Sequence, residues 1–305
     1  MSKKTLLKIA FSNEFIFKVP EGHKFPMEKY DLIARQLLHE GIVEECNFFD
    51  PPPIAQEFLL LAHEEEYLKR FQNLELTPRE QRITGFKHNA ALVEREAKIA
   101  EGTRLAADFA LNHGAAMNVA GGTHHAFSNK GEGFCMYNDI AIAAHYLLNK
   151  NKAQNVLIID LDVHQGNGTA QIFKENANVF TFSMHGKDNY PMRKEISDLD
   201  IELPINTKDD EYLAELNRGM DLISKRFVPD FVFYQAGVDV LTSDKLGKLD
   251  LTIDGVKRRD QTVIDYCKSG SLPLVITMGG GYGDDIKSIV DTHVQLYKMV
   301  NDQFF

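Results

Sequence analysis

The sequence predicts an α/β protein with one mostly parallel β-sheet that helices cover on both faces. Two observations predict this class. Short apolar segments alternate with helix-like segments along most of the chain. The apolar segments are hydrophobic at almost every position, which is typical of strands buried on both faces. No repeat, low-complexity tract or long linker divides the 305 residues, so we expect a single domain over residues 1–305.

The expected elements follow in chain order. Strands are expected at 6–12, 115–121, 155–160, 178–184, 230–237 and 273–280. Helices are expected at 26–40, 88–112, 138–149, 168–176, 210–226, 252–269 and 285–300. The stretch Thr77-Pro78-Arg79-Glu80 carries a helix-start signature, a capping threonine with glutamate three residues later. In the long helix that Gly114 ends, we expect an apolar face formed by Leu92, Ile99, Leu105 and Phe109.

Composition restricts the classes of function. The chain has 34 basic and 44 acidic residues, a net charge of −10, which argues against nucleic-acid binding and is compatible with a cationic ligand such as a lysine-bearing peptide or a polyamine. Its three cysteines form no CxxC pair and no disulfide framework, which indicates a reducing compartment. No run approaches the roughly 20 apolar residues of a membrane span. The N-terminal apolar stretch is too short for a signal peptide. We therefore expect a soluble, cytoplasmic protein.

Chemically active side chains follow the ends of five expected strands. The loops read GGTHHAF (121–127), DLDVHQGNG (160–168), MHGKDNYP (184–191), QAGVDV (235–240) and MGGGYGDD (278–285). Ligand sites of parallel sheets lie beyond the carboxyl ends of the strands. We therefore expect the five loops to form one site.

A metal site is expected from DLDVHQGNG. Asp162 and His164 are two residues apart, so in an extended segment both side chains leave the same face. Asp239 is the best candidate for a third ligand. Such a set suits zinc with a fourth position open to water. An isolated DxDxH could also be a solvated turn, but the matching Asp239 and a nearby histidine pair disfavour that interpretation.

The other loops offer acid–base groups. His124 and His125 are adjacent and should point in different directions while both border a pocket. Histidine is the usual general base near neutral pH, and Asp160 is spaced to orient one of the two rings. Tyr282, within a glycine-rich loop, could donate to an oxyanion. A phosphate-binding role for this loop is weaker, because the lysine and spacing of a P-loop are missing.

Three further residues have ordinary structural interpretations. Taken alone, the aromatic side chains of Phe134 and Tyr190 are more typical of core packing than of a binding site. Cys135 lacks an evident neighbour that would stabilise a thiolate, so we do not expect it to be a nucleophile.

The motifs together resemble one family. GGTHHAF, GFCMYND, DLDVHQGNG, QAGVD and GGGYG occur in the order found in the zinc-dependent histone deacetylases of the arginase–deacetylase superfamily. The resemblance extends from GHKFP at 22–26 to GGGYG at 279–283. The stretches GHKFPMEKY, HQGNG, DNYP and SDLDIELP are most similar to the class IV branch and its bacterial relatives. Classes I and II typically have an aspartate at the position of Asn167.

The resemblance implies a role for each motif residue. One zinc ion, with iron(II) as an alternative, is held by Asp162, His164 and Asp239. His125, oriented by Asn167, is the base that later protonates the leaving amine; His124, supported by Asp160, is its electrostatic partner; and Tyr282 polarises the carbonyl. The implied acyl-lysine tunnel is lined by Phe134, Tyr190, Gly133 and Gly280. The implied structural potassium ion is held by Asp160, Asp162, His164, Ser183 and Met184, with a second near Phe173 and Val179.

The expected activity is therefore removal of acetyl or longer acyl groups from an N-acyl-lysine of a protein or peptide. A small acylated amine, such as an acetylpolyamine, is the alternative substrate. Lys29 stands where class I has an arginine, and residues 73–90 offer no counterpart of its substrate-binding rim aspartate. A non-catalytic acyl-lysine binder is disfavoured because no motif residue is missing, and an arginase-like dimanganese enzyme because the ligands suffice for one metal. Acyl length and oligomeric state stay open.

Overall fold

In a computed structural model, which describes residues 6–305, eight strands form one sheet in the order β2-β1-β3-β8-β7-β4-β5-β6. All neighbouring pairs are parallel. The strands are β1 (Lys8–Ala10), β2 (Phe48–Phe49), β3 (Ala115–Asn118), β4 (Val156–Asp160), β5 (Val179–Gly186), β6 (Leu199–Leu203), β7 (Phe231–Gln235) and β8 (Leu274–Thr277). The predicted fold class is confirmed.

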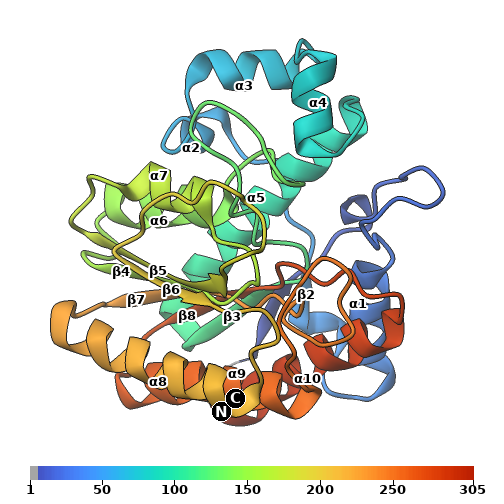
Figure 1. Ribbon diagram of the computed structural model, residues 1–305. Helices are drawn as coiled ribbons and strands as arrows, with labels where there is room; N and C mark the ends of the chain where they lie inside the picture. Colours follow the sequence, from blue (N-terminus) through green and yellow to red (C-terminus); the bar gives the residue numbers. More distant parts are fainter. Residues whose placement is uncertain (1–5) are drawn as a thin grey trace.

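Helices cover both faces of this sheet (Figure 1). One layer contains α5 (Ala90–His113), α6 (Asp139–Asn149) and α7 (Asn167–Phe173), with α2 (Gln56–Leu59), α3 (Glu65–Gln72) and α4 (Pro78–Thr84) beyond them. The opposite layer contains α8 (Asp209–Arg226), α9 (Ile253–Ser269) and α10 (Ile286–Phe304), and α1 (Lys29–His39) packs on α10. None of the helices within residues 6–305 is both long and apolar enough to span a membrane.

The sequence located six of the eight described strands but missed β2 and β6. β2 has only two residues, too few to show a periodic pattern. β6 alternates buried Ile201 and Leu203 with the acidic Asp200 and Glu202, as is typical of a strand at the edge of a sheet. The first five residues of the N-terminal stretch, which we expect not to be a signal peptide, lie outside the described residues.

The sequence predicted the ends of helices more accurately than it predicted which residues of a helix are buried. The capping box at Thr77 is present, and Gly85 ends α4 in a left-handed conformation. In α5 the expected apolar face was only half right, because Leu92 and Ile99 are buried whereas Leu105 and Phe109 are half-buried. Small residues fill much of the buried face instead: Gly102, Thr103, Ala106, Ala107 and Ala110. They let α5 approach the sheet and α6 closely.

The sheet order explains where a site can form. β3, β8, β7 and β4 are consecutive neighbours, and their carboxyl ends lead directly into the loops at 121–127, 278–285, 235–240 and 160–168. The chain passes from β3 to β4 without filling the two positions between them, which β7 and β8 occupy later. Loops far apart in sequence therefore meet at one edge of the sheet.

Candidate metal and catalytic centre

Three side chains converge just beyond β4 and β7. Asp162, His164 and Asp239 are all buried, and one ligand atom from each lies within 4.8 Å of the others. His164 Nδ1 lies 3.0 Å from Asp162 Oδ1 and 3.0 Å from Asp239 Oδ2. The structure thus brings together the three residues that the sequence proposed as metal ligands.

The electrostatics of this group favour a cation. Burial opposes the charged form of His164, but its hydrogen bonds to Asp162 and Asp239 raise its pKa to about 10. Burial and the neighbouring charge of Asp162 raise the pKa of Asp239 to about 7. Two carboxylates around one imidazole nitrogen form a donor set that zinc prefers. The residues present therefore fit a single divalent metal ion.

Gly280 packs against these carboxylates. Its amide donates to Asp162 Oδ2 at 2.7 Å, and a Cβ at this position would lie 1.9 Å from Asp239 Oδ2. Only glycine leaves room here for both acids. Gly280 thus lies beside the acids and lines the same cavity as Gly133 and Phe134.

The two adjacent histidines line the cavity next to the acids. Their ring centroids are 4.1 Å apart, so they lie side by side instead of pointing apart as expected. The main chain turns at this point, with the Ala126 amide donating to the Thr123 carbonyl, which is why the alternation of an extended segment does not apply. His124 Nδ1 lies 2.7 Å from Asp160 Oδ2, and His125 Nδ1 lies 2.6 Å from Asn167 Oδ1.

The different partners give the two rings opposite pKa shifts. Burial opposes the charge on His124, but the carboxylates of Asp160 and Asp162 raise its pKa above the ordinary value. Burial and the positive rings of His124 and His164 hold the pKa of His125 well below its ordinary value. The pair therefore combines a His124 whose surroundings favour the protonated form with a His125 whose surroundings favour the neutral, proton-accepting form.

The glycine-rich loop 279–283 presents Tyr282 to the same cavity. The ring of Tyr282 lies 6.2 Å from that of His164, measured between centroids. The Gly279 and Tyr282 amides donate to the Gly121 carbonyl and to the Asp244 carboxylate. With these amides engaged inside the protein, and that of Gly280 also taken, three of the loop's amides are not available to a phosphate, which disfavours a phosphate-binding role.

A tight turn forms the outer wall of the cavity. Glu132 and Cys135 exchange two backbone hydrogen bonds of 2.9 Å, and the residues between them, Gly133 and Phe134, have φ of 52° and 68°. A left-handed conformation is unusual for a bulky residue such as phenylalanine and is typical of functional sites. A Cβ on Gly133 would lie 2.6 Å from the His125 ring and 3.3 Å from Tyr190, so glycine permits their approach.

The Phe134 ring joins an aromatic cluster that the sequence did not indicate. Its centroid lies 5.3 Å from Phe25 and 5.4 Å from Phe86, and these two rings are 5.8 Å apart. Phe25 also lies 5.8 Å from Tyr282. Phe86 follows Gly85 and Phe25 lies two residues after His23, and this proximity to glycine and histidine was the only signal in the sequence. On the other side, the Tyr190 ring meets His125 edge-on at 5.1 Å.

The structure gives the remaining predicted residues distinct surroundings. Asp160 and Ser183 are register partners on β4 and β5, beside the buried Met184, which brings the proposed potassium ligands onto neighbouring strands. Phe173 and Val179 flank the turn between α7 and β5.

Cys135 is buried, and burial raises the pKa of its thiol well above the ordinary value, which argues against a nucleophile.

Two cations lie near the inner end of the cavity. Lys29 is fully buried, donates to the Gly279 carbonyl at 3.0 Å, and lies over the Tyr282 ring. Burial lowers its pKa to about 8. Arg95 of α5 lines the cavity itself and is paired with Glu96, a contribution that the sequence did not predict.

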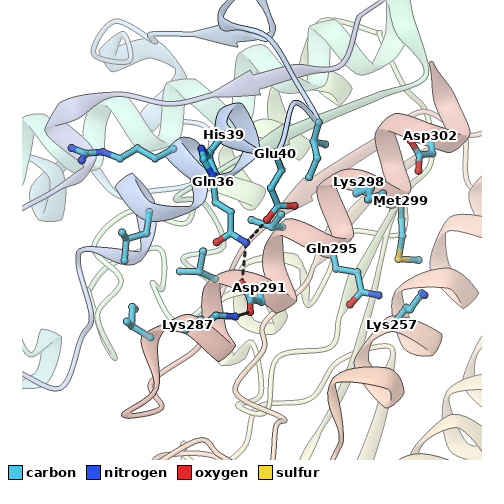
Figure 2. Close-up of a pocket in the computed structure, with 16 residues that line it drawn as sticks. Gln36, His39, Glu40, Lys257, Lys287, Asp291, Gln295, Lys298, Met299 and Asp302 are labelled. Carbon is cyan, nitrogen blue, oxygen red and sulfur yellow. Dashed lines mark hydrogen bonds and ion pairs between the residues drawn. The ribbon is translucent and has the colours of Figure 1, made fainter.

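A larger hollow lies elsewhere on the described surface. A groove of about 1020 Å³ runs between α1 and α10, whereas the cavity beside the histidine pair measures about 30 Å³. Figure 2 shows the groove residues Gln36 and Lys287 meeting at Asp291. It contains none of the converging buried acids and histidines, so its size alone does not make it a candidate active site.

Comparison with known proteins accounts for this arrangement. The family model of the histone deacetylase domain matches residues 23–297. The chain belongs to the histone deacetylase family. Membership of this family, which is zinc-dependent in general, supports a hydrolytic deacetylase.

Individual relatives agree with the family. An uncharacterized protein of Picosynechococcus sp. is 40% identical, over 97% of this chain and 99% of its own length. Histone deacetylase 2 of Arabidopsis thaliana is 32% identical, over 85% of this chain and 70% of its own. Among solved structures, an HDAC homologue from Aquifex aeolicus has a TM-score of 0.85 at 22% identity, covering 97% of this chain and 84% of that one. An HDAC homologue in complex with SAHA has a TM-score of 0.84 at 23% identity, with the same coverage of 97% and 84%. These two similarities establish the shared fold.

Proposed function

We propose that this histone deacetylase family member is a zinc-dependent amidohydrolase that removes acyl groups from N-acyl-lysine side chains. The observation that carries the proposal is the contact between a buried Asp162–His164–Asp239 donor set and a histidine pair whose pKa values are shifted in opposite directions. When bound, the metal ion supplies Lewis-acid chemistry, lowering the pKa of a water and polarising the acyl carbonyl.

Side chains of the protein carry out the proton transfers and stabilise the charges that develop during the reaction. Neutral His125 takes the proton of the attacking water and later delivers it to the departing amine nitrogen. His124, whose protonated form is stabilised by Asp160 at 2.7 Å, favours the negative charge that develops nearby. The Tyr282 hydroxyl donates to the oxyanion of the tetrahedral intermediate. The products are a free acid and lysine, and no covalent intermediate with the protein is needed.

The walls of the cavity support an acyl-lysine ligand. Phe134 and Tyr190, together with Gly133, surround the approach to His125 and suit the alkyl part of a lysine side chain. Tyr190 is partly exposed, and Met192, two residues further along the same loop, is largely exposed. The chain from residue 23 to 297 acts as one catalytic unit in this proposal, which also includes a structural potassium ion between β4 and β5.

Class IV character further supports the proposal. Asn167 contacts His125 where classes I and II place an aspartate, in line with the resemblance of HQGNG to the class IV branch. The same branch suggests acyl chains longer than acetyl.

A turnover screen tests the substrate class. The zinc-loaded protein is assayed against lysine peptides with acyl chains of increasing length and against acetylpolyamines, with metal analysis of the same sample. Turnover of acyl-lysine peptides supports the proposal, and selective turnover of acetylpolyamines would replace it with the small-amine alternative. Two manganese ions per chain with no amide hydrolysis would overturn both.

A further inference from the structure

The proposed base is connected to a carboxylate that none of the motif-based roles includes. Asn167 accepts at Oδ1 from His125 and donates from Nδ2 to Glu132 Oε1 at 3.0 Å. The same Glu132 oxygen accepts a hydrogen bond from the Tyr190 hydroxyl. The other oxygen, Oε2, lies 2.7 Å from the Lys130 ammonium. Both carboxylate oxygens of Glu132 are therefore occupied, and the side chain is only 12% exposed.

The direction of each hydrogen bond in this series follows from the one before it. The ionised Glu132 carboxylate can only accept, so it must face the amide nitrogen of Asn167. Asn167 then has only its oxygen to offer His125, and that oxygen can only accept. His125 must therefore carry its proton on Nδ1, which leaves the lone pair on Nε2 free to take a proton.

The ionisation of Glu132 that this argument requires is secured locally. Burial acts against the charge, but hydrogen bonds from Lys130, Tyr190 and Asn167 lower the pKa of Glu132 below the ordinary value. An amide without such a partner can rotate by half a turn and present its NH₂ group to the ring. That orientation would favour the opposite tautomer, with the proton on Nε2 and no base available.

We propose that Glu132 is a positioning residue that fixes the Asn167 amide and thereby selects the His125 tautomer with a free Nε2. The expected effect of Glu132 on turnover rests on the proposed function, in which His125 is the base. In this chain the Glu132 carboxylate does not contact the imidazole directly, as an aspartate at position 167 would, because the Asn167 amide lies between them. Its charge acts through an oriented amide, and the same carboxylate holds the Tyr190 hydroxyl of the substrate-facing wall.

A charge-exchange series tests the proposal. Glu132→Gln keeps the size and at least one accepting oxygen, but the new amide can turn either its oxygen or its nitrogen toward Asn167. We expect kcat to fall about tenfold with KM within about twofold, as for loss of an outer partner of a catalytic histidine. In the double variant Glu132→Gln with Asn167→Asp, the aspartate accepts from His125 in either orientation of the new amide. We expect kcat of the double variant to recover to at least the level of Asn167→Asp alone.

The control is Glu64→Gln, a glutamate that accepts a hydrogen bond from Ser128 in the neighbouring loop. It should leave kcat within about twofold of the parent. Ring-nitrogen NMR of the ¹⁵N-histidine-labelled protein reads the His125 tautomer directly: Nδ1–H in the parent and the double variant, and a mixture in Glu132→Gln. Parent-like kcat and tautomer in Glu132→Gln, or a double variant slower than Glu132→Gln, would overturn the proposal. If the parent hydrolyses no acyl-lysine, the proposed function fails, while the tautomer still tests the role of Glu132.

Discussion

The two sides of the candidate site are built in different ways. The metal side, Asp160, Asp162, His164 and Asp239, follows directly from β4 and β7, so sheet register sets its geometry. The tunnel side, Glu132, Phe134 and Tyr190, comes from irregular loops and includes a phenylalanine with φ of 68°. We therefore expect the residues of the metal side to keep their positions when neighbouring residues are changed, and activity to be lost when a ligand atom is removed. Changes on the tunnel side should have smaller, graded effects on activity, because they alter the orientation and packing of side chains.

Removing a donor from the metal side should have the largest effect. Asp239→Asn conserves shape but eliminates a charged ligand, so we expect kcat/KM to fall on the order of 10³-fold. Elemental analysis should show less bound zinc than in the parent, and we expect added zinc to raise the Tm of the parent but not that of the variant. Asp291→Asn, in the groove between α1 and α10, removes the same charge far from the site and should retain parent activity. Full zinc content and turnover in Asp239→Asn would exclude this residue as a ligand.

Tyr282 stands between the two sides, because its ring meets both His164 and the aromatic cluster. Tyr282→Phe should lower kcat on the order of 10²-fold, by analogy with the loss of one oxyanion donor, with a smaller change in KM. Steady-state kinetics on the preferred acyl-lysine peptide measure this split. Tyr266→Phe, a hydroxyl deletion on α9, is the matched control. Near-parent turnover by Tyr282→Phe would remove the tyrosine from the chemistry.

The same contrast explains what the sequence could predict. The metal side was predictable because buried strands have a clear pattern, and their carboxyl ends must meet in a parallel sheet. Glu132 could not be found this way, since its contact with Asn167 depends on a turn with two positive φ values. The side-by-side histidines were missed for the same reason, as a local main-chain turn overrides the alternation of an extended segment.

Changing the partner of the base should shift its pH dependence. The pKa of His125 is held well below its ordinary value by burial and by the neighbouring cationic rings. A carboxylate in place of the Asn167 amide stabilises the imidazolium and raises that pKa. The base acts only when neutral. As the pH is lowered, the Asn167→Asp variant should therefore lose activity at a higher pH than the parent does. We expect the acidic limb of the kcat/KM profile to move up by about one pH unit. An unmoved limb would contradict the assignment of His125 as the base.

The smallest effect should come from the packing of the tunnel side. Gly85 has φ of 78°, and a Cβ there would lie 2.5 Å from the Phe134 ring, whereas Gly41 has φ of 65° with no atom within 4 Å. Alanine at either position strains the backbone, and each variant should lose about 1 kcal/mol of unfolding free energy in denaturant titrations. Only Gly85→Ala also displaces the ring, so we expect KM for acyl-lysine to rise about threefold in that variant alone. Equal KM values in both variants would mean that the position of Phe134 does not shape the substrate site, and the tunnel side would then reduce to its contacts with His125.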